Sequence, residues 1–148
     1  IGYFLGGAAG IVRRGGAELA AAAPSRIART FQGTTKYPGV DRFRDILLKR
    51  GTILYGAFPG QSAFYTTASA LRRSGRSADA LFDGLQLAIS SKYPRRTSVA
   101  AYELIEDTPA AFGLAIANAE YGTGWLPQVV VPSFAESLRF VREIPLVP

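Results

Sequence analysis

The 148-residue chain contains neither cysteine nor histidine. The lack of cysteine excludes disulfide bonds, thiolate nucleophiles and cysteine-based zinc sites. The lack of histidine removes the usual general base and the commonest metal ligand, and with them Ser-His-Asp catalysis and histidine-based RNA cleavage. Catalysis by this protein must therefore use carboxylates, amides, hydroxyls, arginine or lysine. No group of carboxylates has the spacing of metal ligands, so we expect no metal site.

Long apolar runs are also missing. Residues 1–10 are apolar and rich in glycine, but two arginines follow at positions 13 and 14, whereas a membrane-spanning helix needs roughly 20 apolar residues. The positive charge comes after the apolar stretch, which is the reverse of a signal peptide. We expect no membrane partner. We interpret residues 1–25 as a linker or as the tail of an upstream region, and residues 26–148 as one globular domain.

Basic residues outnumber acidic ones. The 17 Lys and Arg against 11 Asp and Glu give a formal net charge of +6 at pH 7. This balance is explained by solubility alone or by an acidic partner, which would be a nucleic acid, a phosphate-bearing ligand or an acidic protein. The basic residues are spread along the chain without a sustained block, which argues against a nucleic-acid partner.

Hydrophobic periodicity and turn residues predict a mixed α+β domain. A helix is expected where Thr67 serves as the N-cap, and another where Ser77 does. The expected strands are residues 26–34, 52–58, 63–66, 98–106, 128–131 and 139–146. The expected helices are residues 37–51, 67–73, 77–90 and 108–118, with a helical turn at residues 133–138. Val40 and Leu47 fall on the apolar face of the first helix, and Thr108 followed by Pro109 is expected to start the last one.

The first motif is FQGT at residues 31–34, followed by a Pro-Gly turn. It resembles the aromatic-His-Gly-Thr strand end of ADP-ribosyltransferases of the diphtheria-toxin type, with Gln32 in the place of His. The resemblance implies that Gly33 and Thr34 bind the nicotinamide end of NAD+, because a glycine lets the backbone approach the ring. It also implies that Gln32 binds the adenosine ribose. Arg29, Arg72 and Arg73 flank the motifs and are placed to neutralise the pyrophosphate.

The second motif is SAFYTT at residues 62–67. It is similar to the Phe-Tyr-Ser-Thr strand end of the same family, which runs into a helix. The resemblance implies that the Tyr65 ring stacks on nicotinamide, by area burial and cation–π attraction, with Thr66 beside it. The second tyrosine that the family carries on that helix is missing here, and Tyr55 or Phe58 is the candidate replacement. A second alignment remains open, in which the strand LYGAF at residues 54–58 is the first motif instead of FQGT.

The third motif is LPQVVVP at residues 126–132, where Gln128 opens a strand after the loop YGTGW. Diphtheria-type enzymes have a catalytic Glu at this position, and NAD-hydrolysing toxins of the tuberculosis-necrotizing-toxin type have Gln after a glycine-rich loop. The resemblance to this family covers about residues 30–146. It implies a small split β-sheet, the ADP-ribosyltransferase-like fold, with helices flanking a central cleft.

The reaction that the resemblance implies is cleavage of the nicotinamide–ribose bond of NAD(P)+, which is a substrate here and not a resident cofactor. Gln128 and Tyr65 are the expected catalytic residues. Because an amide is not a base, we expect NAD+ hydrolysis ahead of mono-ADP-ribosylation of a target-cell protein. Two alternatives come from other functional classes. They are a basic toxin directed at RNA and a non-catalytic interaction domain.

The resemblance also implies a biological setting. The chain would be the C-terminal module of a longer polymorphic toxin used in interbacterial competition. It would be secreted or delivered into a target cell and would act in that cell's cytoplasm. A cognate immunity protein is expected to protect the producer, and an acidic one would match the charge of +6.

Overall fold

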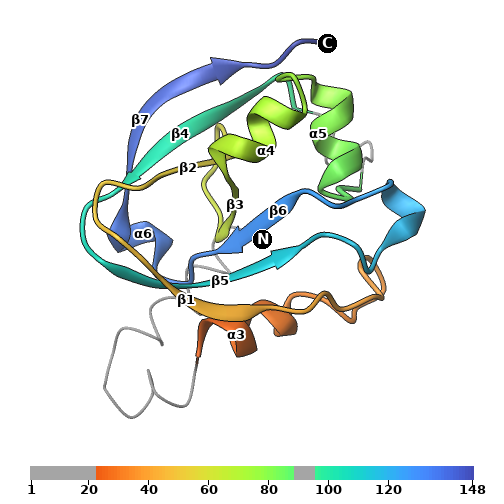
Figure 1. The fold of residues 1–148 in the computed structure, drawn as a ribbon, viewed down its shortest axis with the longest axis horizontal. Helices are drawn as coiled ribbons and strands as arrows, with labels where there is room; N and C mark the ends of the chain where they lie inside the picture. The colour runs from red at the N-terminus through yellow and green to blue at the C-terminus, as the bar shows by residue number, and fades with distance from the viewer. Residues whose placement is uncertain (1–22, 89–95) are drawn as a thin grey trace.

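The computed structural model describes residues 23–88 and 96–148. This part of the chain forms seven strands, four short α-helices and a 3-10 turn, and their arrangement can be followed in Figure 1. The helices are α3 (Pro24–Thr30), α4 (Ala68–Arg73), α5 (Ala78–Gly84) and α6 (Phe134–Ser137), and the 3-10 turn η1 is Ala119–Tyr121. The strands are β1 (Arg44–Leu48), β2 (Ile53–Ala57), β3 (Phe64–Thr66), β4 (Ser98–Leu104), β5 (Thr108–Leu114), β6 (Pro127–Val130) and β7 (Leu138–Pro145).

Hydrogen bonds join all of these strands into one sheet, in the order β1-β5-β6-β3-β2-β4-β7. Every neighbouring pair is antiparallel. The α+β prediction is therefore confirmed. In Figure 1, α4 and α5 lie together over the half of the sheet that holds β2 and β4, while α3 lies under β1. The helix α3 packs against β1, β5 and β6.

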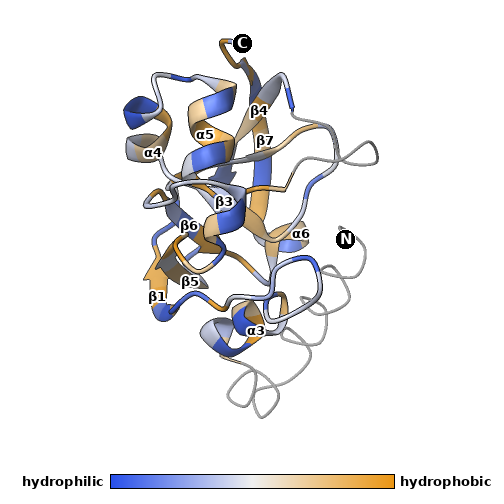
Figure 2. Ribbon diagram, turned by 90° about the vertical axis from the view of Figure 1, so that its right-hand side faces the viewer, coloured by the Kyte–Doolittle hydropathy of each residue, from blue (hydrophilic) through white to orange (hydrophobic). Residues whose placement is uncertain are grey.

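Two apolar clusters hold the helices on the sheet. The larger cluster includes Leu54, Val129 and Phe134. The smaller one lies under α4 and α5 and includes Leu71 and Leu81. Each fully buried aliphatic side chain of this size contributes about 1.5–3 kcal/mol relative to exposure. Figure 2 shows the consequence for α4 and α5, each of which has one hydrophobic and one hydrophilic side.

Most predicted elements are confirmed, because their local signals agree with the tertiary structure. The strands at β2, β3, β4, β6 and β7 form where they were expected, and so does the helical turn α6. The hydroxyl of Thr67 accepts a hydrogen bond from the Ala70 N–H at 3.2 Å, and Ser77 caps α5 in the same way through Ala80. The helix α5 ends at Gly84, earlier than predicted, and residues 89–90 of the prediction lie outside the described residues.

The predicted strand at residues 26–34 is wrong, because residues 24–30 form α3 and a turn follows. Pro24 occupies the first turn of this helix, where its missing N–H costs nothing. Pro24 and Ser25 are buried, and the Ser25 N–H and hydroxyl donate to the Asp45 carboxylate at 2.7 and 2.9 Å. Residues 1–22, most of the predicted linker, lie outside the described residues.

The predicted helices at residues 37–51 and 108–118 are also wrong, because these segments pair with each other as β1 and β5. Val40 and Leu47, expected on the buried face of a helix, are 46% and 55% exposed. Pro109 was expected to start a helix. It lies instead at the start of β5, before the part that pairs with β6, where a residue without an N–H is tolerated. The register of a neighbouring strand decided the structure of both segments.

Candidate functional site

Three predicted site residues share one face of the sheet. Gln128 of β6 pairs with Gly113 of β5, and Tyr55 of β2 pairs with Thr66 of β3. The pairing of Tyr65 with Val129 places Thr66 next to Gln128 across the β3–β6 ladder. Directly paired residues of antiparallel strands project to the same face. Gln128, Thr66 and Tyr55 therefore form a cross-strand row, which we call the polar row.

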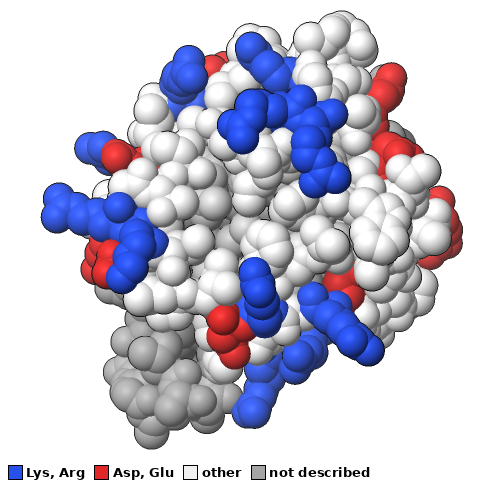
Figure 3. Space-filling view, in the orientation of Figure 1, with Lys and Arg blue, Asp and Glu red and all other residues white. Residues whose placement is uncertain are grey.

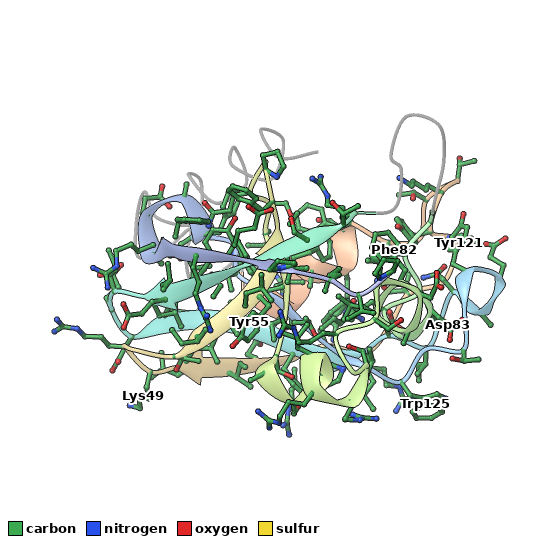
Figure 4. The ribbon with its side chains drawn as sticks, turned by 90° about the horizontal axis from the view of Figure 1, so that it is seen from above. Lys49, Tyr55, Phe82, Asp83, Tyr121 and Trp125 are labelled. Atoms are coloured by element: carbon green, nitrogen blue, oxygen red, sulfur yellow. The ribbon has the colours of Figure 1, made fainter. Side chains whose placement is uncertain are left out.

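The polar row is largely covered. Thr66 is 3% exposed and Gln128 is 8% exposed. The Thr66 hydroxyl donates to the Pro127 carbonyl at 2.6 Å, so its oxygen remains available as an acceptor. Tyr55 is half-buried, and Figure 4 shows it near the middle of the molecule, far from Trp125 at the edge.

Asp41 connects the first and third motifs. Its Oδ2 atom accepts from Gln128 Nε2 at 2.8 Å and from Gln32 Nε2 at 3.2 Å. Its Oδ1 atom accepts from the backbone N–H groups of Ile116 at 2.8 Å and Ala117 at 2.6 Å. The Asp41 N–H in turn donates to Gln32 Oε1 at 2.6 Å. Asp41 is 3% exposed as a residue, so a buried carboxylate fixed by N–H donors lies directly beside Gln128.

These bonds fix the orientation of the Gln128 amide. Its Nε2 group donates to Asp41 Oδ2 and, at 3.4 Å, to the carbonyl of Leu114. Both neighbours are acceptors only, so the amide nitrogen must face them and Oε1 must face the other way. Among the described residues, no donor bonds to Gln128 Oε1. The side chain thus offers a carbonyl oxygen to a ligand.

Two glycines let the segment that carries Asp41 lie directly on β5. A Cβ atom on Gly113 would lie 2.4 Å from the Arg42 carbonyl oxygen and 3.2 Å from the Phe43 ring. A Cβ atom on Gly39 would lie 2.0 Å from the Ala117 carbonyl oxygen. The contacts of 2.4 and 2.0 Å with backbone oxygens are too short for a real side chain, so the glycines are required for Asp41 to reach Gln128.

A cavity of about 540 Å³ opens beside Asp41, a size typical of small-molecule sites. Its lining includes Arg42 and Arg44, and the Arg44 guanidinium lies 5.2 Å from the centre of the Phe112 ring. Figure 3 shows basic side chains over α4 and others along the β1 edge of the same face, with uncharged, hollowed surface between them. The arginines of α4 are Arg72 and Arg73. Arg44 pairs with Phe112, and Phe112 with Val129, the partner of Tyr65, so the Arg44 side chain projects to the face opposite the polar row.

Tyr65 lies elsewhere than the resemblance implies. It neighbours Thr66 in β3 and so projects to the opposite face of the sheet, where it is 4% exposed. Its ring packs edge-on against Tyr102 with 5.6 Å between centroids, and its hydroxyl accepts from Gln61 Nε2 at 2.8 Å. Burial raises the pKa of the Tyr65 phenol. Tyr65 is thus a core residue in this structure, and Tyr55 is the tyrosine on the face of Gln128.

The remaining residues of the first motif belong to a turn. The N–H groups of Gly33 and Thr34 donate to the Tyr37 carbonyl at 2.7 and 3.0 Å, which occupies the donors expected to bind nicotinamide. Arg29 donates to the Phe43 carbonyl at 3.4 Å. Of the motif, only Gln32 approaches Gln128, through Asp41. Of the two alignments left open, the structure therefore favours the one that takes LYGAF as the first motif, because this strand pairs directly with the FYT strand.

Sequence reasoning missed the residues that hold the loop before Gln128. Gln86, which is 3% exposed, accepts from the Asn118 N–H at 2.9 Å and donates to the Gly122 carbonyl at 3.1 Å. Asn118 accepts from the Gly39 N–H at 2.8 Å. Asp83 accepts from the N–H and hydroxyl of Thr123. These bonds connect α5, the loop and the Asp41 segment, and only their polarity within apolar surroundings was visible in the sequence.

Trp125 lies at the end of this loop and is 59% exposed with a φ of 76°, a backbone conformation that is unusual for a large residue. Figure 4 shows its indole directed outward, on the side of the molecule that also holds Asp83 and Tyr121. Backbone bonds fix the position, because the Trp125 N–H donates to the Ala115 carbonyl at 2.9 Å.

Within residues 23–88 and 96–148, no group of three or more His, Cys, Asp or Glu residues is arranged to hold a metal ion. In the same part of the chain, every helix is too short or too polar to cross a membrane.

Comparisons with known proteins identify relatives of the chain. A family model described as the Rhs1 C-terminal toxin domain matches residues 20–133, a range that contains Asp41 and the whole polar row. The solved structure of Rhs1-CT in complex with cognate immunity protein RhsI1 aligns with a TM-score of 0.81 and 30% identity. That alignment covers 84% of this chain and 97% of the other. No curated protein matches the chain.

Two further solved structures align more loosely. The structure of Tse6 in complex with Tsi6 has a TM-score of 0.45 and 12% identity, over 69% of this chain and 73% of the other. The structure of Tne2 in complex with Tni2 has a TM-score of 0.49 and 13% identity, over 71% of this chain and 92% of the other.

Proposed function

The chain belongs to the Rhs1 C-terminal toxin domain family, and we propose that this toxin domain cleaves the nicotinamide–ribose bond of NAD(P)+. The single observation that carries the proposal is the polar row, in which Asp41 holds the Gln128 amide nitrogen and no donor among the described residues bonds to the amide oxygen. These residues come from motifs that are far apart in the sequence, and the sheet register brings them to one face.

In the proposed reaction, the bond between C1′ of the ribose and the nicotinamide nitrogen breaks, and its electron pair leaves with neutral nicotinamide. The remaining sugar passes through an oxocarbenium-like state, as in glycoside hydrolysis. A water molecule then adds to C1′ and releases a proton to solvent, which leaves ADP-ribose. Positive charge develops on the sugar, so the site must present electron-rich atoms to it.

Gln128 fits this requirement because its carbonyl oxygen can accept a hydrogen bond from a ribose hydroxyl and place the negative end of its dipole near C1′. Tyr55 offers a half-buried aromatic ring on the same face, which suits stacking on the flat cationic nicotinamide. The Thr66 oxygen provides a further acceptor between them. These groups orient the substrate without an acid or a base.

The helix α4 supports binding of the phosphate-bearing part of the substrate. It carries Arg72 and Arg73 and packs at the same apolar cluster as Tyr55, on the side of the polar row. Guanidinium groups bind phosphate oxygens in a bidentate fashion. Arg29, named from the sequence for this role, is the weaker candidate because it donates to the backbone of Phe43.

Hydrolysis is favoured over transfer to a protein acceptor. A protein nucleophile is weak and needs a base to activate it, whereas water can capture an oxocarbenium ion unaided. Gln128 is an amide, and the carboxylate nearest to it is already bonded to N–H donors. Transfer of ADP-ribose to a target-cell protein is the alternative, and the experiment below separates the two.

The partners follow from the family. Toxin domains of this type are delivered into target cells, where we propose that this one acts on the cytoplasmic NAD(P)+ pool. The related Rhs1-CT is solved in complex with a cognate immunity protein. We propose that this chain also has one, and that it is acidic because the chain carries a net charge of +6.

The test is nicotinamide release by the purified domain. We expect NAD+ to be converted to nicotinamide and ADP-ribose without any added protein, and Gln128→Ala to lower kcat by about 100-fold. Gln61→Ala is the matched control, because Gln61 bonds to Tyr65 on the opposite face. Labelled NAD+ that modifies lysate proteins, with no free ADP-ribose, would support transfer instead. NAD+ that stays intact with and without lysate would refute both reactions, and RNA would be the next substrate.

A further inference from the structure

Asp41 lies one hydrogen bond away from the position where the resembling enzymes have their catalytic glutamate. Given the proposed cleavage of NAD(P)+, we propose that Asp41 is the positioning residue of the site and supplies its negative charge through the Gln128 amide. The carboxylate would touch neither the ribose nor nicotinamide. It would act by holding Gln128 in one orientation and by polarising its carbonyl.

The orientation follows from the acceptors around Gln128. An amide side chain that is turned over exchanges its donor for its acceptor, and the two forms have nearly the same shape. Here the Asp41 carboxylate at 2.8 Å and the Leu114 carbonyl at 3.4 Å both require the Nε2 group. Without Asp41, only the weaker bond to Leu114 would distinguish the two forms. Asp41 therefore determines which atom the substrate meets.

The polarisation follows from burial. Asp41 is 3% exposed, and a charge acts more strongly where water is excluded. An N–H that donates to a carboxylate leaves more electron density on the carbonyl of the same amide, because hydrogen bonds in a chain strengthen one another. Negative charge is thus relayed to the face of the polar row, from Asp41 Oδ2 through Gln128 Nε2 to Gln128 Oε1. Together the two residues would do what a single glutamate does.

This arrangement also explains why the position holds glutamine. A glutamate at position 128 would place a second carboxylate at about the 2.8 Å that now separates the amide from Asp41. Like charges that close repel strongly. Asp41 and Gln128 are 87 positions apart in sequence, so the sequence gives no sign that they form a unit.

If Asp41 had a purely structural role, Asp41→Asn should keep the activity of the wild type. Its Oδ1 atom anchors the backbone of Ile116 and Ala117, and an asparagine could keep those bonds with its own carbonyl oxygen. The amide nitrogen of Asp41→Asn would then face Gln128 Nε2, donor against donor. Gln128 would turn over and present its NH2 group to the ribose. Anchoring would survive in this variant, but the acceptor would be lost.

The experiment compares Asp41→Asn, Gln128→Glu and the double variant in the purified domain, with NAD+ as the substrate. We expect kcat of Asp41→Asn to fall about 100-fold while KM stays within about threefold of the wild type. Gln128→Glu should also lose activity, because two carboxylates then face each other. The double variant restores a donor–acceptor pair between positions 41 and 128, with a carboxylate oxygen toward the substrate, and should regain at least about tenfold over Asp41→Asn.

Asp45→Asn is the matched control, because Asp45 is exposed and bonds to Ser25 of α3. We expect it to keep wild-type kcat. Melting temperatures are measured for every variant. Each single variant at positions 41 and 128 should melt roughly 3–6 °C below the wild type, and the double variant should recover part of that loss.

The outcomes separate the two proposals. If the wild type cleaves NAD+ and Asp41→Asn keeps kcat within about threefold, Asp41 does not act through Gln128, and the proposed function stands. A double variant that recovers its melting temperature but not kcat would show that the pairing is structural only. If the wild type leaves NAD+ intact, the proposed function fails and the role of Asp41 in it falls too, while the melting temperatures still report the pairing.

Discussion

Replacement of Gly113 by alanine tests whether the close approach of the Asp41 segment to β5 maintains the site. The new Cβ atom would lie 2.4 Å from the Arg42 carbonyl oxygen, a backbone atom that cannot rotate away. Ordinary carbon–oxygen contacts begin at about 3.3 Å, so the backbone at Arg42 must move by about 0.9 Å. Arg42 follows Asp41 directly, so the displacement reaches the site.

The displacement has two consequences. Overpacking of this kind costs about 1–3 kcal/mol of folding free energy. The distance from Gln128 Nε2 to Asp41 Oδ2 is 2.8 Å, and a shift of about 0.9 Å takes it beyond about 3.5 Å, where the hydrogen bond is lost. We therefore expect Gly113→Ala to lower kcat for nicotinamide release by about tenfold or more, in protein that remains folded.

The assay combines urea unfolding with nicotinamide release at saturating NAD+. Val99→Ala is the control for stability, because Val99 is 8% exposed in β4, away from Asp41 in the sheet order. Its truncation should cost about 1.5–3 kcal/mol and leave kcat of the folded protein unchanged. The reasoning is refuted if Gly113→Ala unfolds at the wild-type urea concentration, or if its kcat matches that of Val99→Ala.

Two further predictions concern stability. Thr67→Ala removes the hydroxyl that accepts from the Ala70 N–H at 3.2 Å and should cost about 1 kcal/mol by urea unfolding; an unchanged midpoint would show that the cap is not required. Burial, the largest cause, raises the pKa of Tyr65 above its ordinary 10.0 and outweighs the opposing bond from Gln61. The Tyr65 contribution is therefore complete below pH 10 and declines as pH rises above it, because only the unfolded chain releases the proton readily. Melting temperatures measured from pH 8 to about 11.5 should fall less steeply for Tyr65→Phe than for the wild type, and equal slopes would contradict this.

Local signals were enough wherever a segment's own side chains decide its structure. The caps at Thr67 and Ser77 start α4 and α5 because each side chain satisfies an N–H of the helix that follows. The branched residues of β6 are buried on both faces and form a strand from their pattern alone. These elements were predicted correctly because local preference and tertiary environment agree.

The errors arose where pairing overrides local preference. Residues 44–48 and 108–114 both have patterns compatible with a helix, yet the two segments pair with each other as antiparallel strands. A pairing between residues 60 to 68 positions apart leaves no local signal in the sequence. Apolar residues three or four positions apart also occur in short strands by chance. The helical signal at Thr108-Pro109 was misleading for the same reason, since a proline is tolerated at a strand start.

Three residues of the candidate site could be named from the sequence, but the contacts between its residues could not. Gln128, Thr66 and Tyr55 each follow from a motif, and the sheet register places them in one row. Tyr65 was assigned to the ligand because a strand residue's face cannot be known before its register is. A shift of one residue along a strand moves a tyrosine ring from the face where it could stack on a ligand to the face where it packs in the core.

The negative charge proposed for the site shows most clearly why sequence motifs alone do not identify it. A catalytic glutamate is visible as one residue in one motif, whereas the role proposed for Asp41 and Gln128 is divided between a loop and a strand 87 positions apart. Each residue alone has an ordinary explanation, the aspartate as an anchor for backbone N–H groups and the glutamine as a polar residue at a strand start. Only the distance of 2.8 Å between them makes a unit. Substitutions at either position should therefore be tolerated in matched pairs and not singly, which is the behaviour that the double variant Asp41→Asn with Gln128→Glu measures.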